Sequence, residues 1–150
     1  MGSSFHWANV NEALSEFNRI LKSKGIFTAV YNPRDIEKNE LHQTIEKKIK
    51  EIVPELNRIS SGASHNVFGI EQKLLSSPYF GELFFCEAAH VERMTKERYL
   101  GAWLSVNDIQ VQAGKERWEK ILMMIEEEIF SMNELEIPYK TRAWTVIKKG

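Results

Sequence analysis

The sequence predicts an α/β fold in which about three strands and about five helices form a single domain over residues 1–150. Three segments are short, apolar and rich in branched or aromatic residues, which is typical of buried strands. The segments between them carry apolar residues at helical spacing, with charged residues on the opposite face. Hydrophobic residues at 43% and charged residues at 27% are ordinary for a globular protein, so a chain of this length can enclose a core.

The first predicted unit is a helix that begins at Val10 and leads into a strand over residues 26–31. Asn9 and Glu12 have the spacing of a capping box, in which side chains satisfy backbone amides at a helix start. Gly25 is expected to end the helix in the left-handed conformation. The buried stripe of this helix is predicted to consist of Val10, Ala13, Leu14, Phe17, Ile20 and Leu21.

The middle of the chain is predicted to hold a long surface helix, a loop, a short helix and a strand. Isoleucines and a leucine recur mostly four residues apart over residues 35–52, and Pro54 then stops the helix. Residues 60–66 are rich in serine and contain a glycine, as loops are. A short helix is expected over residues 70–76, followed by a strand over residues 79–89.

The last third is predicted to contain two helices and a long terminal strand. Thr95 is suited to cap a helix that carries Tyr99 and Trp103. Residues 105–113 are compatible with either a helix or a loop, and a further helix runs from Gly114 to about Met132. The residues expected to point inward on it are Trp118, Ile121, Leu122, Ile125, Ile129 and Phe130. Residues 141–147 form the final strand.

Charge and composition argue against several classes of function. The net charge is −1, and basic side chains alternate with acidic ones, so we expect no nucleic-acid partner. No apolar run approaches the length of a membrane span, and the first residues lack the basic start and apolar core of a signal peptide. The lone cysteine, Cys86, permits no internal disulfide. A cytoplasmic location, without membrane contact, is therefore the expectation.

The first 25 residues carry the motifs that point to a family. Phe5-His6-Trp7 is followed by Asn9, the pair Ala13-Leu14, Glu16 and the run Arg19-Ile20-Leu21-Lys22. This block resembles the middle of Rossmann-like, S-adenosylmethionine-dependent methyltransferases, in the subgroup whose fourth strand ends in Phe-His-Trp. In that subgroup a Pro-Gly-Gly turn leads into strand five, whereas this chain has Ser23-Lys24-Gly25.

The C-terminal half is similar to the same family, although each motif there is less specific. An aromatic strand is followed by a Thr-x-Glu helix start, a Trp-Leu-Ser segment, a helix that begins at a glycine and a Pro-Tyr-x-Thr strand. The resemblance implies that the three predicted strands correspond to strands five, six and seven of the family. Strands six and seven would form a hairpin, and the last strand would run antiparallel between the other two.

The glycine-rich loop of the family does not occur in this sequence. Such enzymes hold the cofactor with that loop after strand one and with an acidic residue at the end of strand two. The glycines here are scattered and form no Gly-x-Gly-x-Gly: Gly2, Gly25, Gly62, Gly69, Gly81, Gly101, Gly114 and Gly150. We therefore interpret the chain as the C-terminal half of a methyltransferase domain. It is expected to bind no S-adenosylmethionine by itself.

The resemblance places several residues near the cleft of such an enzyme. His6 and Trp7 follow strand four, where ligands bind in open α/β sheets, but Phe5 or Trp7 could instead pack on the first helix as a hydrophobic staple. Residues on the substrate side would be Tyr31, Asn32, Arg34, Trp103 and Ser105. Asn32-Pro33 is also an ordinary turn after a strand, and an inward tryptophan is also an ordinary core residue. No catalytic residue is assigned.

Other chemical motifs have simpler interpretations. His90-Val91-Glu92 matches part of the zinc deaminase signature but lacks its cysteine pair. His42 and Glu46 lie four residues apart on one helix face without a third metal ligand, and we expect a solvated pair. Cys86 is expected to be a small buried apolar group. The sequence predicts no metal site.

Two hypotheses of different class remain. The chain is either the substrate-side part of an enzyme, or a non-catalytic interaction module. In the second case the exposed edge of the strand at residues 26–31 would pair in a homodimer. A variant of the first hypothesis is a subunit that complements a separate N-terminal half.

Overall fold

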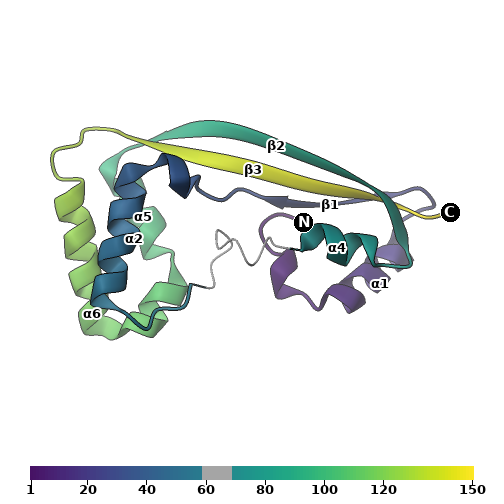
Figure 1. The fold of residues 1–150 in the computed structure, drawn as a ribbon, viewed down its shortest axis with the longest axis horizontal. Helices are drawn as coiled ribbons and strands as arrows, with labels where there is room; N and C mark the ends of the chain where they lie inside the picture. Colours follow the sequence, from purple (N-terminus) through teal and green to yellow (C-terminus); the bar gives the residue numbers. More distant parts are fainter. Residues whose placement is uncertain (59–68) are drawn as a thin grey trace. The chain divides into compact units, whose positions relative to one another are not determined.

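The computed structural model describes residues 1–58 and 69–150, so the loop predicted at residues 60–66 lies outside the described residues. Its elements follow one another as Figure 1 shows. The α-helices are α1 (Val10–Ile20), α2 (Glu40–Ile52), α4 (Ile70–Leu75), α5 (Lys96–Leu104) and α6 (Asn107–Glu128). Two short 3-10 helices are η1 (Phe5–Trp7) and η2 (Ile36–Lys38). The strands are β1 (Ile26–Tyr31), β2 (Phe80–Met94) and β3 (Leu135–Lys148). The predicted α/β class is confirmed.

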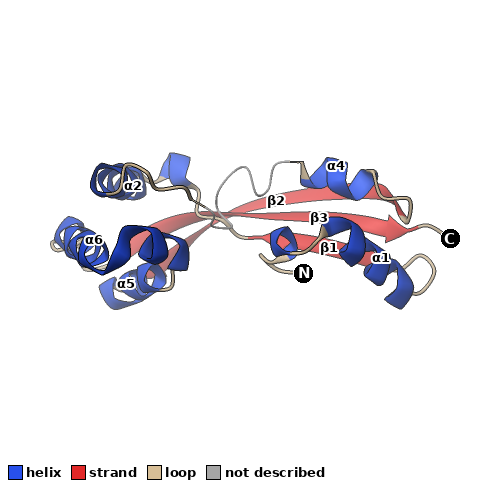
Figure 2. Cartoon of the chain, turned by 90° about the horizontal axis from the view of Figure 1, so that it is seen from below, coloured by secondary structure: helices blue, strands red, loops and turns tan. Residues whose placement is uncertain are grey.

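The three strands form one sheet in the order β1-β3-β2, so the last strand lies between the other two (Figures 1 and 2). β3 runs antiparallel to β1, with Ile26 opposite Ile147 and Tyr31 opposite Arg142. This order and direction agree with the prediction. The predicted hairpin between β2 and β3 is wrong, because α5 and α6 separate the two neighbouring strands along the chain.

The chain divides into two compact units, which we describe separately. Unit 1 comprises residues 1–33, 61–89 and 140–150. In this unit α1 and α4 cover one face of the sheet, as both views show (Figures 1 and 2). Alternate residues of β1 point to that face and are buried, as expected for a strand with one covered face. The buried core consists of Phe5, Leu14, Phe27, Ala29, Tyr31, Ile70, Leu74, Phe80, Trp144 and Val146.

Unit 2 comprises residues 34–60 and 90–139 and contains α2, α5 and α6. Its helices bury one apolar face each against one another, and α2 and α6 pack together. The fully buried residues include Ile45 and Ile49 of α2, Tyr99 and Trp103 of α5, and Ile121 and Ile125 of α6. Trp103, one of the predicted substrate-side residues, therefore lies in the core of this unit.

Several predicted helix boundaries are confirmed by their caps. The Asn9 side chain accepts a hydrogen bond from the Glu12 amide, and the Thr95 hydroxyl accepts one from the Arg98 amide. The helix predicted from residue 35 begins at Glu40, because Asn39 caps it with a bond from the His42 amide at 2.9 Å. Residues 107–113 are helical, and Gly114, at φ +71°, joins them to the next helical stretch.

The predicted role of Gly25 is wrong in its geometry. The residue in the left-handed conformation is Lys24, at φ +58°, and Gly25 has no positive φ. Gly25 is instead required by close approach, because a Cβ there would lie 2.8 Å from the Lys22 carbonyl oxygen.

Two residues expected in buried stripes are exposed. Ile20 lies in the last turn of α1 and points to solvent. Phe130 follows the end of α6 and is 81% exposed, and the Lys96 amino group lies 5.7 Å from the centre of its ring. Both residues stand where a helix ends, so the helical spacing that predicts their direction no longer holds.

Candidate functional site

The segment before α1 lies along the edge of β1 in unit 1. Gly2 forms a parallel bridge with Val30, and the Ser3 amide donates to the Val30 carbonyl at 2.7 Å. The Val30 amide in turn donates to the Met1 carbonyl at 2.9 Å. Phe5-His6-Trp7 therefore follows a short parallel strand segment directly, at the carboxyl end where open α/β sheets bind ligands.

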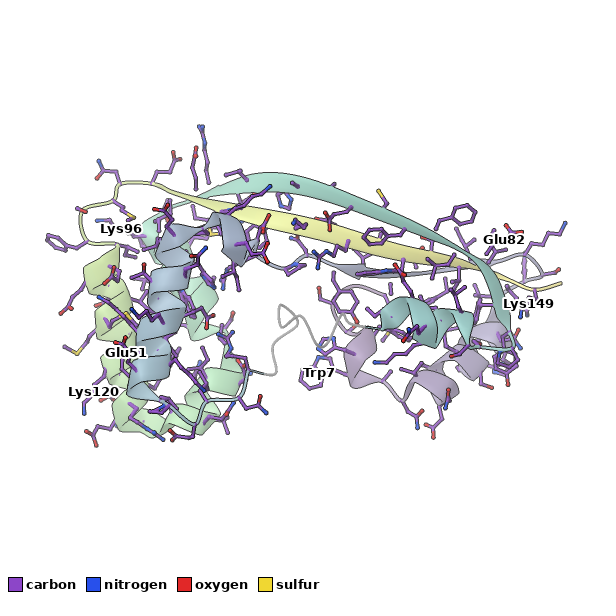
Figure 3. All side chains as sticks on the ribbon, in the orientation of Figure 1. Trp7, Glu51, Glu82, Lys96, Lys120 and Lys149 are labelled. Carbon is purple, nitrogen blue, oxygen red and sulfur yellow. The ribbon has the colours of Figure 1, made fainter. Side chains whose placement is uncertain are left out.

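The three residues of η1 have different surroundings. Phe5 is buried in the core of unit 1, 5.3 Å from the ring of Phe27. Trp7 is 70% exposed, and its side chain is labelled in Figure 3. The centre of the His6 ring lies 4.7 Å from the centre of the Trp7 ring and 5.8 Å from that of Tyr31. Phe5 thus packs as the hydrophobic anchor, and Trp7 does not.

His6 is the polar member of this group. Burial lowers the pKa of its imidazole, so the ring is neutral at pH 7. Neither ring nitrogen has a hydrogen-bond partner in the described parts of the chain. Burial also raises the pKa of Tyr31, and the backbone N–H of His6 opposes that shift.

Asn32 has a structural contact at the end of β1. Its side-chain oxygen accepts a hydrogen bond from the Thr141 hydroxyl at 2.8 Å, which ties the end of β1 to β3. This bond leaves the two N–H donors of the Asn32 side chain unused.

Unit 2 brings Arg34 and Trp103 together from distant parts of the sequence. The Arg34 guanidinium carbon lies 5.3 Å from the centre of the Trp103 ring, within the range of a cation–π interaction. The His42 imidazole stacks on the same indole, with centroids 5.0 Å apart and planes 20° apart. Tyr99, one turn before Trp103 on α5, meets it edge to face at 6.3 Å. These four side chains form what we call the Trp103 cluster.

A chain of polar contacts runs from His42 through Glu46 and Arg58 to Asp108 of α6. His42 Nε2 lies 3.4 Å from Glu46 Oε1, and Arg58 bonds the same oxygen at 2.5 Å and Asp108 at 3.1 Å. Since the His42 side chain is only 2% exposed, the predicted solvated pair is wrong. The four-residue spacing of His42 and Glu46 places them on the same face of α2 but does not show whether that face meets solvent. In the structure, this face packs against Trp103 of α5.

The electrostatics of this pair follow from burial and from its neighbours. Burial lowers the pKa of His42, Glu46 acts against this shift, and Arg34 and Arg58 add to it. Burial raises the pKa of Glu46, but the hydrogen bond from His42 and the charge of Arg58 outweigh it, so the carboxyl pKa is lowered. His42 is therefore neutral, with its Nε2 proton facing Glu46 and Nδ1 as a free acceptor.

Three buried polar atoms of the Trp103 cluster have no hydrogen-bond partner among the described residues: His42 Nδ1, the Tyr99 hydroxyl and Trp103 Nε1. The Trp103 indole opposes the rise in Tyr99 pKa that burial causes, so the two groups are near one another, yet they do not complete a bond. Buried polar groups in folded proteins are nearly always paired, and such a concentration of exceptions asks for an explanation.

Ser105 does not belong to this cluster. It is exposed at the end of α5, and its hydroxyl donates to the Ala102 carbonyl at 2.8 Å. Ser105 therefore has a structural role as the residue that follows the end of α5. His42 and Tyr99, in contrast, are cluster members that were not among the sequence candidates, although their helical spacing to Glu46 and Trp103 was visible.

Other chemical groups offer no site. No set of three His, Cys, Asp or Glu side chains suited to a metal ion occurs within residues 1–58 and 69–150. Cys86 is exposed on β2, so its predicted burial is wrong, because residues 84–91 of this strand are all exposed. Of the helices described, none is both long and apolar enough to cross a lipid bilayer.

Comparison with solved structures identifies the architecture. Over 96% of its length the chain is similar to a presumed type II methyltransferase from Anaeromyxobacter dehalogenans, with a TM-score of 0.57 and 16% sequence identity. The chain therefore shares the fold of part of that protein. A presumed methyltransferase from Bacillus halodurans also matches, over 98% of the chain at 13% identity and a TM-score of 0.38. This chain spans 61% of the length of either protein.

No protein-family model matches the sequence, and neither does any curated protein. The likeness is therefore one of fold.

The residues of unit 1 fit one part of S-adenosylmethionine, the cofactor that the family resemblance implies. The Trp7 ring is exposed and can stack on a flat base, whereas both His6 ring nitrogens are buried and have no partner in the described residues. The loop that approaches the cofactor closely in the family needs clustered glycines, and this sequence has none. The residues present could thus contact the base of the cofactor, but they do not supply the glycine-rich loop that holds it.

Proposed function

We propose that this chain forms the substrate side of an S-adenosylmethionine-dependent methyltransferase and acts with a glycine-rich half that its own sequence does not supply. The observation that carries this proposal is the sheet, with its order β1-β3-β2 and antiparallel last strand, together with the similarity to a methyltransferase structure over nearly the whole chain. Strands β1, β3 and β2 would correspond to strands five, seven and six of the family. The protein would act in the cytoplasm.

The division of labour follows from the reaction. A methyl group passes in line from a sulfonium to a nucleophile, and such a transfer depends mainly on the proximity and orientation of the two reactants. His6 and Trp7 would stand beside the cofactor, supplied from the other half. Tyr31, Asn32, Arg34, Trp103 and Ser105 are the proposed substrate-side residues, among which Arg34 and Trp103 are in contact.

Calorimetry with S-adenosylhomocysteine tests the proposal in two steps. The purified chain alone is expected to show no micromolar binding, because it lacks the glycine-rich loop. If the coding sequence directly upstream encodes such a half, the co-expressed pair is expected to bind at micromolar concentration. Micromolar binding by the chain alone, or no binding by an intact co-purified pair, would contradict the proposal.

A second candidate function is a non-catalytic module that associates with a copy of itself. Exposed apolar residues on the strands favour it, since Ile26 of β1 and Phe84 and Phe85 of β2 are about half exposed or more. The predicted pairing through a free β1 edge is wrong at Thr28 and Val30, because residues 1–3 already bond these positions, so a homodimer would associate through the exposed apolar side chains instead. Light scattering at tens of micromolar discriminates, since a homogeneous monomer argues against the homodimer.

A further inference from the structure

We propose that the Trp103 cluster binds the carboxylate of a small aromatic acid, with Arg34 as the counter-ion and the Tyr99 hydroxyl and Trp103 Nε1–H as hydrogen-bond donors. This inference rests on the proposed function, because the acid would be the methyl acceptor. All of its residues belong to unit 2.

The unused donors indicate an acceptor group. Trp103 Nε1 can only donate, and the Tyr99 hydroxyl can donate, and both are fully buried without a partner in the described structure. An unmade bond of this kind costs a buried donor about 1–3 kcal/mol, so a group that accepts from both would repay that cost on binding. A carboxylate has two oxygens with which to do so.

The ion pairs nearby show which cation of the cluster is open to an anion. Arg58 is already held by two carboxylates, Glu46 and Asp108, and His42 is neutral. Arg34 contacts the face of Trp103 and forms no ion pair among residues 1–58 and 69–150. The charges of Arg34 and Arg58 equal those of Glu46 and Asp108, so these four groups balance, and Arg34 is the cation among them that these carboxylates do not hold; a bound carboxylate would add one negative charge and a phosphate up to two.

The aromatic rings select a flat ligand. His42 stacks on Trp103, and its contact with Glu46 holds the imidazole in place, so the imidazole keeps the indole in a fixed orientation. Arg34 is only half buried, which makes it the member of the cluster that a ligand reaches from solvent. If the guanidinium turns from the indole to a carboxylate, the ring of an aromatic acid can take its place on Trp103.

Titration of the whole chain with benzoate, observed through the indole N–H signals in ¹H–¹⁵N NMR spectra, tests this inference. The Trp103→Phe variant assigns the Trp103 signal, and benzoate is expected to move that signal saturably at millimolar concentration. Benzamide has the same shape without the charge and serves as the matched ligand, for which no saturable shift is expected.

Matched variants then separate the roles. Arg34→Gln is expected to weaken benzoate binding tenfold or more, and Tyr99→Phe about threefold to tenfold, since each removes one polar group with little loss of packing. Arg98→Gln, on the same unit but paired with Glu92 at the surface, is the control and should leave binding unchanged.

Each outcome decides the question. Absence of a saturable shift, an equal response to benzamide, tighter binding of inorganic phosphate, or unchanged binding by Arg34→Gln would each overturn the carboxylate site. The calorimetric test with S-adenosylhomocysteine is independent of it. A pair that binds S-adenosylhomocysteine while the chain ignores benzoate would leave the methyltransferase standing and refute only the acid.

Discussion

Replacement of His42 by Phe is expected to remove an acid-induced loss of stability. Burial lowers the pKa of His42 in the folded protein, whereas in the unfolded chain it titrates near 6.5. The unfolded state therefore takes up a proton that the native state does not, and this contribution to stability is present above pH 6.5 and is lost as the pH falls below it. A Phe ring at this position can keep the stacking on Trp103.

The size of the effect follows from proton linkage. One proton bound by the unfolded state alone lowers the free energy of unfolding by about 1.4 kcal/mol between pH 7.5 and pH 5.5, if the native imidazole stays neutral throughout. Glu46 remains ionised over this range, because its pKa is lowered in the native state. His6 contributes in the same direction, but it does so in both proteins and cancels from the difference.

Urea unfolding of the wild type and of His42→Phe at the two pH values measures this double difference. The wild type should lose about 1.4 kcal/mol more than the variant on acidification. His90→Phe, at a position where the imidazole stacks on Tyr139, is the control and should lose as much as the wild type. If His42→Phe and the wild type respond equally to pH, the reasoning about a buried neutral imidazole is wrong.

Two further predictions concern stability alone. Tyr99→Phe removes a buried hydroxyl without a partner among the described residues, so the free energy of unfolding should stay equal or rise by about 1 kcal/mol, and a clear loss in urea unfolding would show a hidden hydrogen bond. Lys24→Gly relieves the strain of a left-handed backbone conformation, so it should raise the free energy of unfolding by about 1 kcal/mol and with it the melting temperature. Gly25→Ala, at the next residue, should lower the free energy of unfolding by about 1–3 kcal/mol, because the new Cβ meets the Lys22 carbonyl oxygen. Equal melting temperatures for the two variants would refute the roles assigned to Lys24 and Gly25.

Local signals in the sequence predicted the starts of α1 and α5 correctly. Asn9 and Thr95 cap their helices by bonds to residues three positions later, so both partners lie within one turn and the pattern contains the whole interaction. Gly25 shows the limit of such signals, since a glycine after a helix is compatible with a left-handed turn or with a close contact, and only the backbone path decides between them.

The candidate site could be predicted only in part, because it depends on contacts between distant residues. Arg34 and Trp103 were both candidates, but that they touch is set by the packing of α5 in unit 2. His42 was expected to form a solvated pair with Glu46, and α2 instead turns this side of the helix toward Trp103. Helical spacing shows which residues share a face and not what that face packs against.

The two helices between β2 and β3 bear on the order in which the protein folds. Neighbouring strands that are joined directly can pair early, whereas this pair must first close a long stretch of chain, at an entropic cost that grows with its length. α5 and α6 are local structures, and their formation shortens the path between the strand ends. Unit 2 should therefore acquire its helices before the sheet closes, and the amides of β3 should be among the last to become protected from exchange with solvent during refolding.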